Sequence, residues 1–488
     1  MRRQFLGALL FAGTLAFTAC QNETIIYVDE NGNPIENVEL KEGEGLLKIN
    51  LSNTSADSRA VRPVGSSAAA NNVNVVKIYV FKGANTASGN EDYKFDNAVG
   101  VATGIENVSA ASGVITITNF TSTAGEHEIT EGSWENHTDQ TKTIKLTGLA
   151  VNSKYKFVAV GYNVGSGNTN PYGEPSLSNG TTTLDAFTTT ALGEEKTDYD
   201  IEELFAGVSD ENATQADKAA FNTPASVTLT RQVAGMLGYF DNVPTKIDGK
   251  VVQYVRVYAN DEYTQFKWPA QLLGTGSPFN GDSQAAAGSS NGEGSNKYLL
   301  MEFNMETIAT NWNSGNPNED TYTFSSFGDA GATGTETAGN QIGSTVGSKA
   351  PLATGYTAPA GLKLVANSIF GGRYIIPYKA HVDSQTLTVE LQDASGNALK
   401  TLKVTTNEVP SQIASEAAPT KYAYDIRCNN FYSIGKKLYT DNTGGDPDPG
   451  TDPKDPEPDE PIDLSSNTNI VVIINDAWEV LHNMGVEE

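Results

Sequence analysis

The sequence predicts an all-β protein, because short alternating runs of Thr, Val, Ile and Tyr recur along a glycine-rich chain. The chain has 488 residues, including 47 glycines, and charged residues make up only 19% of it. Alternation of apolar and polar residues is typical of half-buried strands, and abundant glycine indicates turns and long loops between them. A chain of this length has room for two or more domains, each with a core of its own.

The first half of the chain contains a series of predicted strands. In residues 45–51 (GLLKINL), the apolar side chains Leu47, Ile49 and Leu51 alternate with polar ones and predict the first strand. A long strand at 227–240 is expected to bend near Gly235 and to close the first domain at residue 240. Further strands are expected at 73–81, 113–119, 143–149 and 154–162, and short helical or irregular insertions at 198–205 and 213–221.

The second half repeats this kind of pattern. A hairpin is predicted at 386–404, because residues 394–397 (ASGN) form a turn signal between two alternating runs. Two stretches rich in Gly, Ser and Ala, 274–295 and 327–349, are expected to be surface loops, with ligand-binding loops as the alternative. The remaining strands of this half are expected at 250–258, 298–303, 372–378 and 421–434.

The amino terminus is predicted to be a targeting segment. Arg2 and Arg3 precede an apolar stretch at 5–17, which is too short to span a membrane comfortably. The segment ends in FTAC rather than in an ordinary cleavage site, and so resembles the lipobox of bacterial lipoproteins, with Phe17 in place of the usual Leu. Cys20 is therefore the predicted lipidation site, carrying palmitate or a similar acyl chain; a plain signal peptide is the alternative.

The charge of the chain and its reactive residues argue against several classes of function. The formal net charge of −27 disfavours binding to nucleic acid and to anionic lipid surfaces. The four histidines have no zinc-ligand spacing, and no hydrolase or phosphate-loop motif is complete, since GSTVGSK at 343–349 lacks the required ending. We therefore expect no enzyme, no catalytic residue, no metal site and no cofactor. Cys428, the second of two cysteines, is expected to be a small buried apolar residue.

A loop that could be cut by a protease follows the first predicted strand. Residues 52–72 (SNTSADSRAVRPVGSSAAANN) are rich in Ser, Ala and Asn, have no periodicity and contain two arginines. Exposed loops of this composition are preferred sites of proteolysis. Arg62 is followed by Pro63, which hinders cleavage, so Arg59 is the predicted cleavage residue and Arg62 the alternative.

The carboxyl terminus combines an apolar strand with an acidic leash. Residues 444–466 are rich in Asp and Pro and are predicted to form an extended linker; a calcium site on these carboxylates is the less favoured alternative. Residues 467–488 follow, and the run IVVII at 470–474 has the composition of a strand that needs a sheet to bury it. An unpaired apolar strand promotes aggregation, so a strand placed on a long spacer indicates donation to a neighbouring molecule.

These features predict polymerisation by strand exchange. Cutting after Arg59 would separate the strand of Leu47, Ile49 and Leu51 from the rest of its domain and leave an apolar groove. The terminal strand of another copy would fill this groove, and head-to-tail donation of this kind yields a filament. The expected inward face of the donor strand is Ile470, Val472, Ile474, Trp478 and Val480, unless a bulge near residues 475–476 switches the register.

The chain resembles the fimbrillins, the shaft subunits of type V pili, and in layout it is most similar to the minor-fimbria shaft protein. The resemblance rests on Cys20, on the arginine loop, on the strands at 73–81 and 227–237, and on residues 425–438 (DIRCNNFYSIGKKL) followed by the Asp-Pro spacer and a strand containing Trp478. It implies two transthyretin-like β-sandwich domains, at 60–240 and 241–443. It also implies a signal peptide at 1–20, a propeptide at 21–59, a linker at 444–466 and a donor strand at 467–488.

The resemblance further implies export as a lipoprotein to the outer membrane, cleavage by an Arg-specific protease and growth into an extracellular fimbria that supports adhesion or biofilm formation. The expected partners are identical subunits and other fimbrial anchor or tip subunits. Two alternatives stay open. One is an accessory or tip fimbrial adhesin. The other is a surface lipoprotein that binds glycans through its aromatic side chains. A third possibility for the terminal strand is that it packs on its own second domain.

Overall fold

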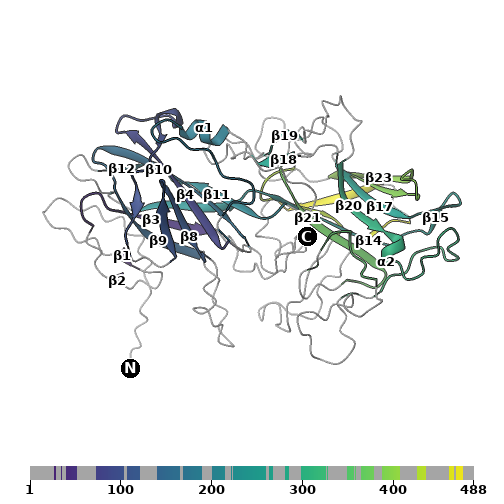
Figure 1. Cartoon of the computed structure of the whole chain (residues 1–488). Coiled ribbons are helices and arrows are strands. Elements are labelled where there is room, and N and C mark those ends of the chain that lie inside the picture. Colours follow the sequence, from purple (N-terminus) through teal and green to yellow (C-terminus); the bar gives the residue numbers. More distant parts are fainter. Residues whose placement is uncertain are drawn as a thin grey trace, which may run out of the picture.

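The computed structural model contains almost only strands, which confirms the all-β prediction (Figure 1). The helices are short: η1 (Asn90–Asp92), α1 (Leu184–Thr189) and α2 (Met305–Ile308). The described residues are 27–28, 34–35, 40–51, 73–103, 107–120, 140–164, 167, 169–189, 201–214, 221, 224–259, 263–266, 281–284, 298–325, 327, 349–356, 358, 364–377, 387–406, 426–435, 461–465 and 469–475.

The first large sheet has eleven strands and occupies one end of the molecule. Its strands are β3 (Gly45–Leu51), β4 (Val75–Ala84), β5 (Lys94–Phe95), β6 (Gly100–Val101), β7 (Val108–Ala111), β8 (Val114–Thr118), β9 (Gln140–Thr147), β10 (Ser153–Tyr162), β11 (Leu204–Val208), β12 (Asn212–Ala213) and β13 (Ala225–Arg231). The sequence predicted the long strands among them, from alternation in β3 and from runs rich in Val, Ile, Tyr and Phe in β4 and β10.

The prediction for residues 198–205 was wrong at its end, where β11 begins. Leu204, Phe205 and Ala206 are all buried, since β11 lies between β10 and β13 and both faces of the sheet are covered there. A strand that is buried on both faces has no alternation of apolar and polar residues, so its sequence lacks the signal of a strand.

The second large sheet has nine strands. These are β14 (Ala234–Asp241), β17 (Tyr254–Ala259), β20 (Tyr298–Asn304), β21 (Ser368–Ile375), β22 (Leu387–Gln392), β23 (Ala398–Thr406), β24 (Phe431–Ile434), β25 (Ile462–Asp463) and β26 (Asn469–Asn475). The small pairs are β1 (Tyr27–Val28) with β2 (Pro34–Ile35), β15 (Lys246–Ile247) with β16 (Lys250–Val251), and β18 (Tyr263–Phe266) with β19 (Gly281–Gln284). The hairpin of β22 and β23 turns as predicted, with Gly396 at a φ of +79°.

The long strand predicted at 227–240 is two strands that belong to different sheets. β13 ends at Arg231 and β14 begins at Ala234, so the break lies at residues 232–233 rather than near Gly235. Both residues at the break are buried, and the chain passes from one sheet to the other without a surface loop. The change of sheet therefore precedes the domain end predicted at residue 240.

The two sheets contain the same arrangement of seven strands. In the first sheet the order is β9-β3-β13-β11-β10-β4-β8, and in the second it is β21-β14-β24-β23-β22-β17-β20 once β26 is left out. When the seven strands of each set are numbered 1 to 7 in the order in which they occur along the chain, their order across the sheet is 4-1-7-6-5-2-3 in both. The directions also agree, because the first and last strands of each set pair in parallel and the other described pairs are antiparallel. The chain thus builds one strand topology twice.

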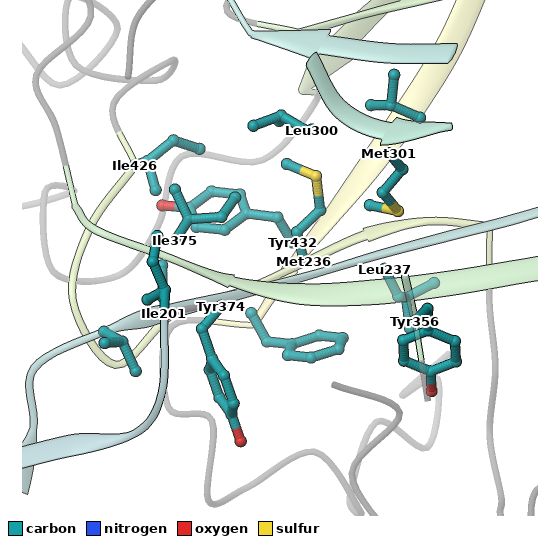
Figure 2. Packing of buried hydrophobic residues seen from close by; sticks show 14 of the residues in the cluster. Ile201, Met236, Leu237, Leu300, Met301, Tyr356, Tyr374, Ile375, Ile426 and Tyr432 are labelled. Atoms are coloured by element: carbon teal, nitrogen blue, oxygen red, sulfur yellow. The ribbon is translucent and has the colours of Figure 1, made fainter. Parts of the chain in front are cut away.

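β4, β10 and β11 of the first sheet bury both of their faces over most of their length, whereas β3 and β13 keep exposed residues on one face. Ile78 on β4 packs with Leu47 and Ile49 of β3, so the sheet closes on itself in the manner of a sandwich. The opposite face of β4 carries Tyr79 and Phe81, which join a second buried cluster that continues into the other sheet. Figure 2 shows part of that cluster, where Met236, Ile375, Ile426 and Tyr432 lie close together.

A buried ion pair lies where the two sheets meet. Arg231, the last residue of β13, donates from Nε to Glu203 Oε1 at 2.9 Å, and the two side chains are only 0% and 4% exposed. Arg231 Nη1 also donates to Asn429 Oδ1 at 3.1 Å, just before β24. The same guanidinium thus connects the last strand of the first set to the last strand of the second.

Candidate functional site

β3, which carries the predicted displaced residues, lies inside the first sheet with a partner on each side. Gly45–Leu51 pairs antiparallel with β9 along its whole length, and residues 47–51 pair in parallel with β13. Leu47, Ile49 and Leu51 are each 0% exposed and belong to the core of this sheet. The structure therefore places all three side chains on the inward face, as the alternation predicted.

Local contacts fix where β3 begins. Gly43 has a φ of +82° and accepts a hydrogen bond from the amide of Leu149 at 2.9 Å, which turns the chain into the sheet. Glu44 pairs with Lys145 of β9 at 2.6 Å. Desolvation raises the pKa of the Glu44 carboxyl, but the hydrogen bonds from Lys145 and from the Lys41 amide outweigh it and lower that pKa overall. A side chain at Gly45 would clash with Leu149 and Phe221, so the first position of β3 accepts only glycine unless these neighbours repack.

Removal of β3 would leave a groove of defined shape. The facing edges of β9 and β13 would each lose a row of main-chain hydrogen bonds, and three apolar pockets would open between them. Burial of three such side chains stabilises the sheet by roughly 5–9 kcal/mol at about 1.5–3 kcal/mol each, as an upper estimate. An incoming strand needs apolar residues at alternate positions to recover that stabilisation.

Several predicted site residues lie outside the described part of the chain. These are Cys20, Arg59, Arg62, Trp478 and Val480. The structure describes the two residues that flank the arginine loop, Leu51 before it and Val73 after it. Both are 0% exposed. A cut in residues 52–72 would therefore separate a core strand from the rest of its sheet.

The terminal strand is not spare in the isolated chain. β26 lies between β23 and β24 of the second sheet, and it is the yellow strand of Figure 1. Residues 469–472 pair in parallel with β23, and residues 472–475 pair antiparallel with β24. The structure describes the backbone of Ile470, Val472 and Ile474. The inward orientation of their side chains stays a prediction.

The predicted linker 444–466 ends earlier than expected, because residues 461–465 dock on the second sheet. β25 pairs in parallel with the far end of β14, and Leu464 is 0% exposed in the core. Lys400 Nζ donates to the carbonyl oxygens of Leu464 at 2.7 Å and of Ser465 at 3.3 Å. Sequence reasoning overlooked this anchor, although Ile462 and Leu464 carry a short alternation at the end of the acidic stretch.

Two carboxylates face each other at this anchor. Asp463 of β25 lies opposite Asp241 of β14, and one oxygen of Asp241 is buried without a hydrogen-bond partner. Burial raises the pKa of Asp241, and the negative charge of Asp463 raises it further. Burial lowers the pKa of Lys400, and the charge of Asp463 opposes that change. The anchor therefore combines apolar docking with a repulsive pair.

The connection that leads to this anchor is much longer than its path requires. Ile434 at the end of β24 lies opposite Gly238, and Ile462 lies opposite Phe240, on the same edge of β14. Two residues of a strand span about 7 Å. Residues 435–461 join these points, and an extended Pro-rich chain of that length reaches on the order of 80 Å at about 3.1 Å per residue. The docked position of the tail does not explain this length.

Other candidate chemistry finds little support in the described residues. Among them, no group of three or more His, Cys, Asp and Glu side chains is arranged to hold a metal ion. Lys349, from the incomplete phosphate-loop motif, donates to the carbonyl oxygens of Glu306 and Ala309 at 2.8 and 2.9 Å. Cys428 is buried, as predicted. No helix in the described ranges is long and apolar enough to cross a membrane.

Many of the described aromatic side chains lie in the core. Tyr79, Tyr155 and Tyr239 are at most 1% exposed, and Trp312 stacks on Tyr322 with ring centroids 6.1 Å apart. Within the described ranges, the large hydrophobic side chains that are exposed are Val151, Leu299 and Val365, none of which is aromatic.

No protein-family model and no curated protein sequence matches this chain. Solved structures give distant likenesses. A candidate cell adhesion protein from Bacteroides eggerthii is 11% identical, with 90% of this chain and 97% of that chain covered and a TM-score of 0.35. The fimbrial anchor protein Mfa2 from Porphyromonas gingivalis is 10% identical, with 80% and 89% covered and a TM-score of 0.29. A fimbrial assembly protein from Parabacteroides distasonis is 10% identical, with 81% and 92% covered and a TM-score of 0.29. At these values the likenesses carry no functional conclusion.

Proposed function

We propose that this protein is a structural subunit of a cell-surface fimbria, made as a lipoprotein at Cys20 and matured by cleavage at Arg59, or at Arg62. Cleavage releases β3, and the terminal strand of the next copy takes its place between β9 and β13. Repetition joins the subunits head to tail into a shaft that supports adhesion or biofilm formation. The protein is not an enzyme, and its partners are its own copies, other fimbrial subunits and an Arg-specific protease.

The observation that carries this proposal is the position of β3. It is a central strand whose Leu47, Ile49 and Leu51 are completely buried, and the loop that follows it contains Arg59 and Arg62. A strand at a sheet edge could be lost without consequence, whereas loss of this one opens a groove between two unpaired edges. Such a groove binds an extended segment by main-chain hydrogen bonds and selects it by alternate side chains.

The terminal strand has the composition that the groove requires. Aligning residues 470–474 with 47–51 places Ile470, Val472 and Ile474 at the positions of the three buried side chains of β3. All three are β-branched aliphatic side chains of similar volume to Leu and Ile. They can therefore fill the same pockets with little loss of packing energy. The long connection at 435–461 supplies the reach to a neighbouring subunit.

The central experiment is cleavage of the purified precursor by an Arg-specific protease. We expect loss of the segment before Ala60 and the appearance of ladders that resist SDS without heating. Arg59→Ala moves the cut to Arg62 or prevents it, and the double variant with Arg62→Ala stays monomeric. Deletion of residues 466–488 abolishes the ladders and leaves a folded, cleavable monomer. Ladders formed by the truncated chain would refute the assignment of the donor strand.

A matched pair of substitutions tests the face of the donor strand. We expect Val472→Asp to abolish the ladders, because a carboxylate would enter an apolar pocket without a partner. Ile473→Asp, on the other face of the same strand, should reduce assembly much less. If Ile473→Asp is the more damaging change, the register is shifted by one residue and the inward face is the opposite one. Equal yields from both variants and from the native chain would argue against strand insertion.

A further inference from the structure

The repeated topology shows that β26 is additional to the strand set of its sheet. In the first sheet, β11 pairs directly with β13, through Phe205 opposite Arg231 and Ala206 opposite Thr230. Their counterparts by rank are β23 and β24, and β26 separates them. Because β26 is parallel to β23 and antiparallel to β24, these two strands are antiparallel to each other, as β11 and β13 are. They therefore already have the relative direction of a direct pair.

The described pairing of β26 is also staggered between its two neighbours. Among the pairs that the structure describes, residues 469–472 lie opposite β23 and residues 472–475 lie opposite β24, with Val472 common to both. By contrast, β3 pairs with β9 over seven residues and with β13 over residues 47–51 at the same time.

We infer that the slot between β23 and β24 is a reversible docking site for the chain's own residues 469–475, and that β23 pairs directly with β24 after they leave. The sheet then adopts the seven-strand order of the first sheet. This docking goes beyond the proposed function because it concerns the single chain before assembly. It rests on that function only for the later use of the released strand.

This docking has a physical purpose in a chain that carries a detachable apolar strand. The run at 470–474 would promote aggregation if it stood free before a groove became available. Insertion into the second sheet satisfies its main-chain groups, and the anchor at Ile462 and Leu464 holds it next to the slot. Because β23 and β24 already run antiparallel to each other, the slot can close when the strand leaves for the groove of another copy.

A cross-link between direct partners tests the docking site. Ser433 of β24 lies opposite Ile473 of β26, so Ser433→Cys with Ile473→Cys brings two thiols together only when the strand is docked. The full chain would carry Cys20→Ser and Cys428→Ala to leave this pair alone. Thr388→Cys with Lys403→Cys, which are partners on β22 and β23, is the control because it links the same sheet without the tail.

We expect the Ser433–Ile473 pair to oxidise in the uncleaved monomer and then to block ladder formation after cleavage, with recovery on reduction. The oxidised control pair should assemble normally. A monomer in which the test pair does not cross-link, or an oxidised test pair that still assembles, would overturn the docking proposal. If neither variant forms ladders even when reduced, the proposed function fails, while cross-linking in the monomer still reports on docking.

Hydrogen exchange tests whether the slot closes. In the chain with residues 466–488 deleted, we expect the amides of β23 and β24 to stay protected within about tenfold of the full chain, because the two strands pair with each other. The amides of β3 serve as the internal control. Loss of protection confined to β23 and β24 by more than about a hundredfold would show that β26 is a permanent part of the sheet and would overturn reversibility.

Discussion

At the scale of single residues, the alternation in residues 45–51 has a measurable counterpart in burial. Leu47, Ile49 and Leu51 are completely buried, whereas Lys48 between them is exposed. The hydrophobic pattern therefore identified the inward face of this strand correctly, side chain by side chain. It could do so because Lys48 and Asn50 on the opposite face are at least partly open to solvent, although Leu46 on that same face is only 5% exposed.

Ile49→Ala is expected to lower the free energy of unfolding of the uncleaved precursor by about 2–4 kcal/mol, because it opens a cavity in a closed core. Lys48→Ala, on the exposed face of the same strand, should change it by less than about 0.5 kcal/mol. Urea denaturation of both variants measures the difference. Under the proposed function, Ile49→Ala should have no effect on the stability of matured ladders, because β3 has left them. An equal loss in precursor and ladder would mean that β3 is retained.

At the scale of elements, β25 is the part of the tail that holds the rest in place, and its strength depends on charge. Asp463 lies opposite Asp241, with Lys400 as the neighbouring cation at this anchor. The folded-state pKa of Asp241 is raised, so its ionised form disfavours the docked state. The docked tail is consequently most stable below that pKa and becomes weaker as the pH rises through it.

We expect Asp463→Asn to flatten this pH dependence and to hold the tail more firmly at neutral pH, since it removes the like charge from beside Asp241. The protection of the Leu464 amide, which donates to the Asp241 carbonyl at 3.1 Å, is the readout after correction for intrinsic exchange. Asp248→Asn is the control, because Asp248 is an exposed turn residue at a φ of +49° that asparagine adopts readily. An unchanged pH profile in Asp463→Asn would rule out the carboxylate pair as its cause.

The elements that the sequence did not predict share a physical reason. β11 is buried on both faces, and the break at residues 232–233 has no turn residue to mark it. The docked position of β26 depends on a gap between β23 and β24, which are distant in sequence, and no local pattern encodes such a gap. The composition of the tail predicted a strand that needs a sheet, and the alternative that it packs on its own second domain is the position that the structure shows.

At the scale of the whole molecule, the two sheets are joined by a shared core and by the buried pair of Arg231 and Glu203. A buried ion pair is weak evidence for stability, but removal of one partner leaves an uncompensated charge. Here that charge would lie between the last strand of the first set and the residues that precede β24. The two halves are therefore expected to unfold together rather than in separate steps.

Glu203→Ala is expected to cost about 3–5 kcal/mol of unfolding free energy and to split the unfolding transition in two, because the junction loosens first. Glu203→Leu combined with Arg231→Met should recover most of the loss. Glu211→Gln serves as the control: its pair with Lys154 at 2.8 Å is partly exposed and contributes less than about 1 kcal/mol. Calorimetry that shows one unchanged transition in Glu203→Ala would refute this coupling.

The parallel pairing of β3 with β13 sets a direction for anything that takes its place. β13 runs on into β14, so a replacement with the polarity of β3 points its carboxyl end toward the second sheet of the molecule that receives it. In the proposed fibre, every contact between subunits would then be asymmetric, and the two ends would differ: one would expose an empty groove and the other an undonated terminal strand. A copy whose arginine loop escapes the protease could give its tail but accept none, so it would act as a terminator and set the length of the shaft.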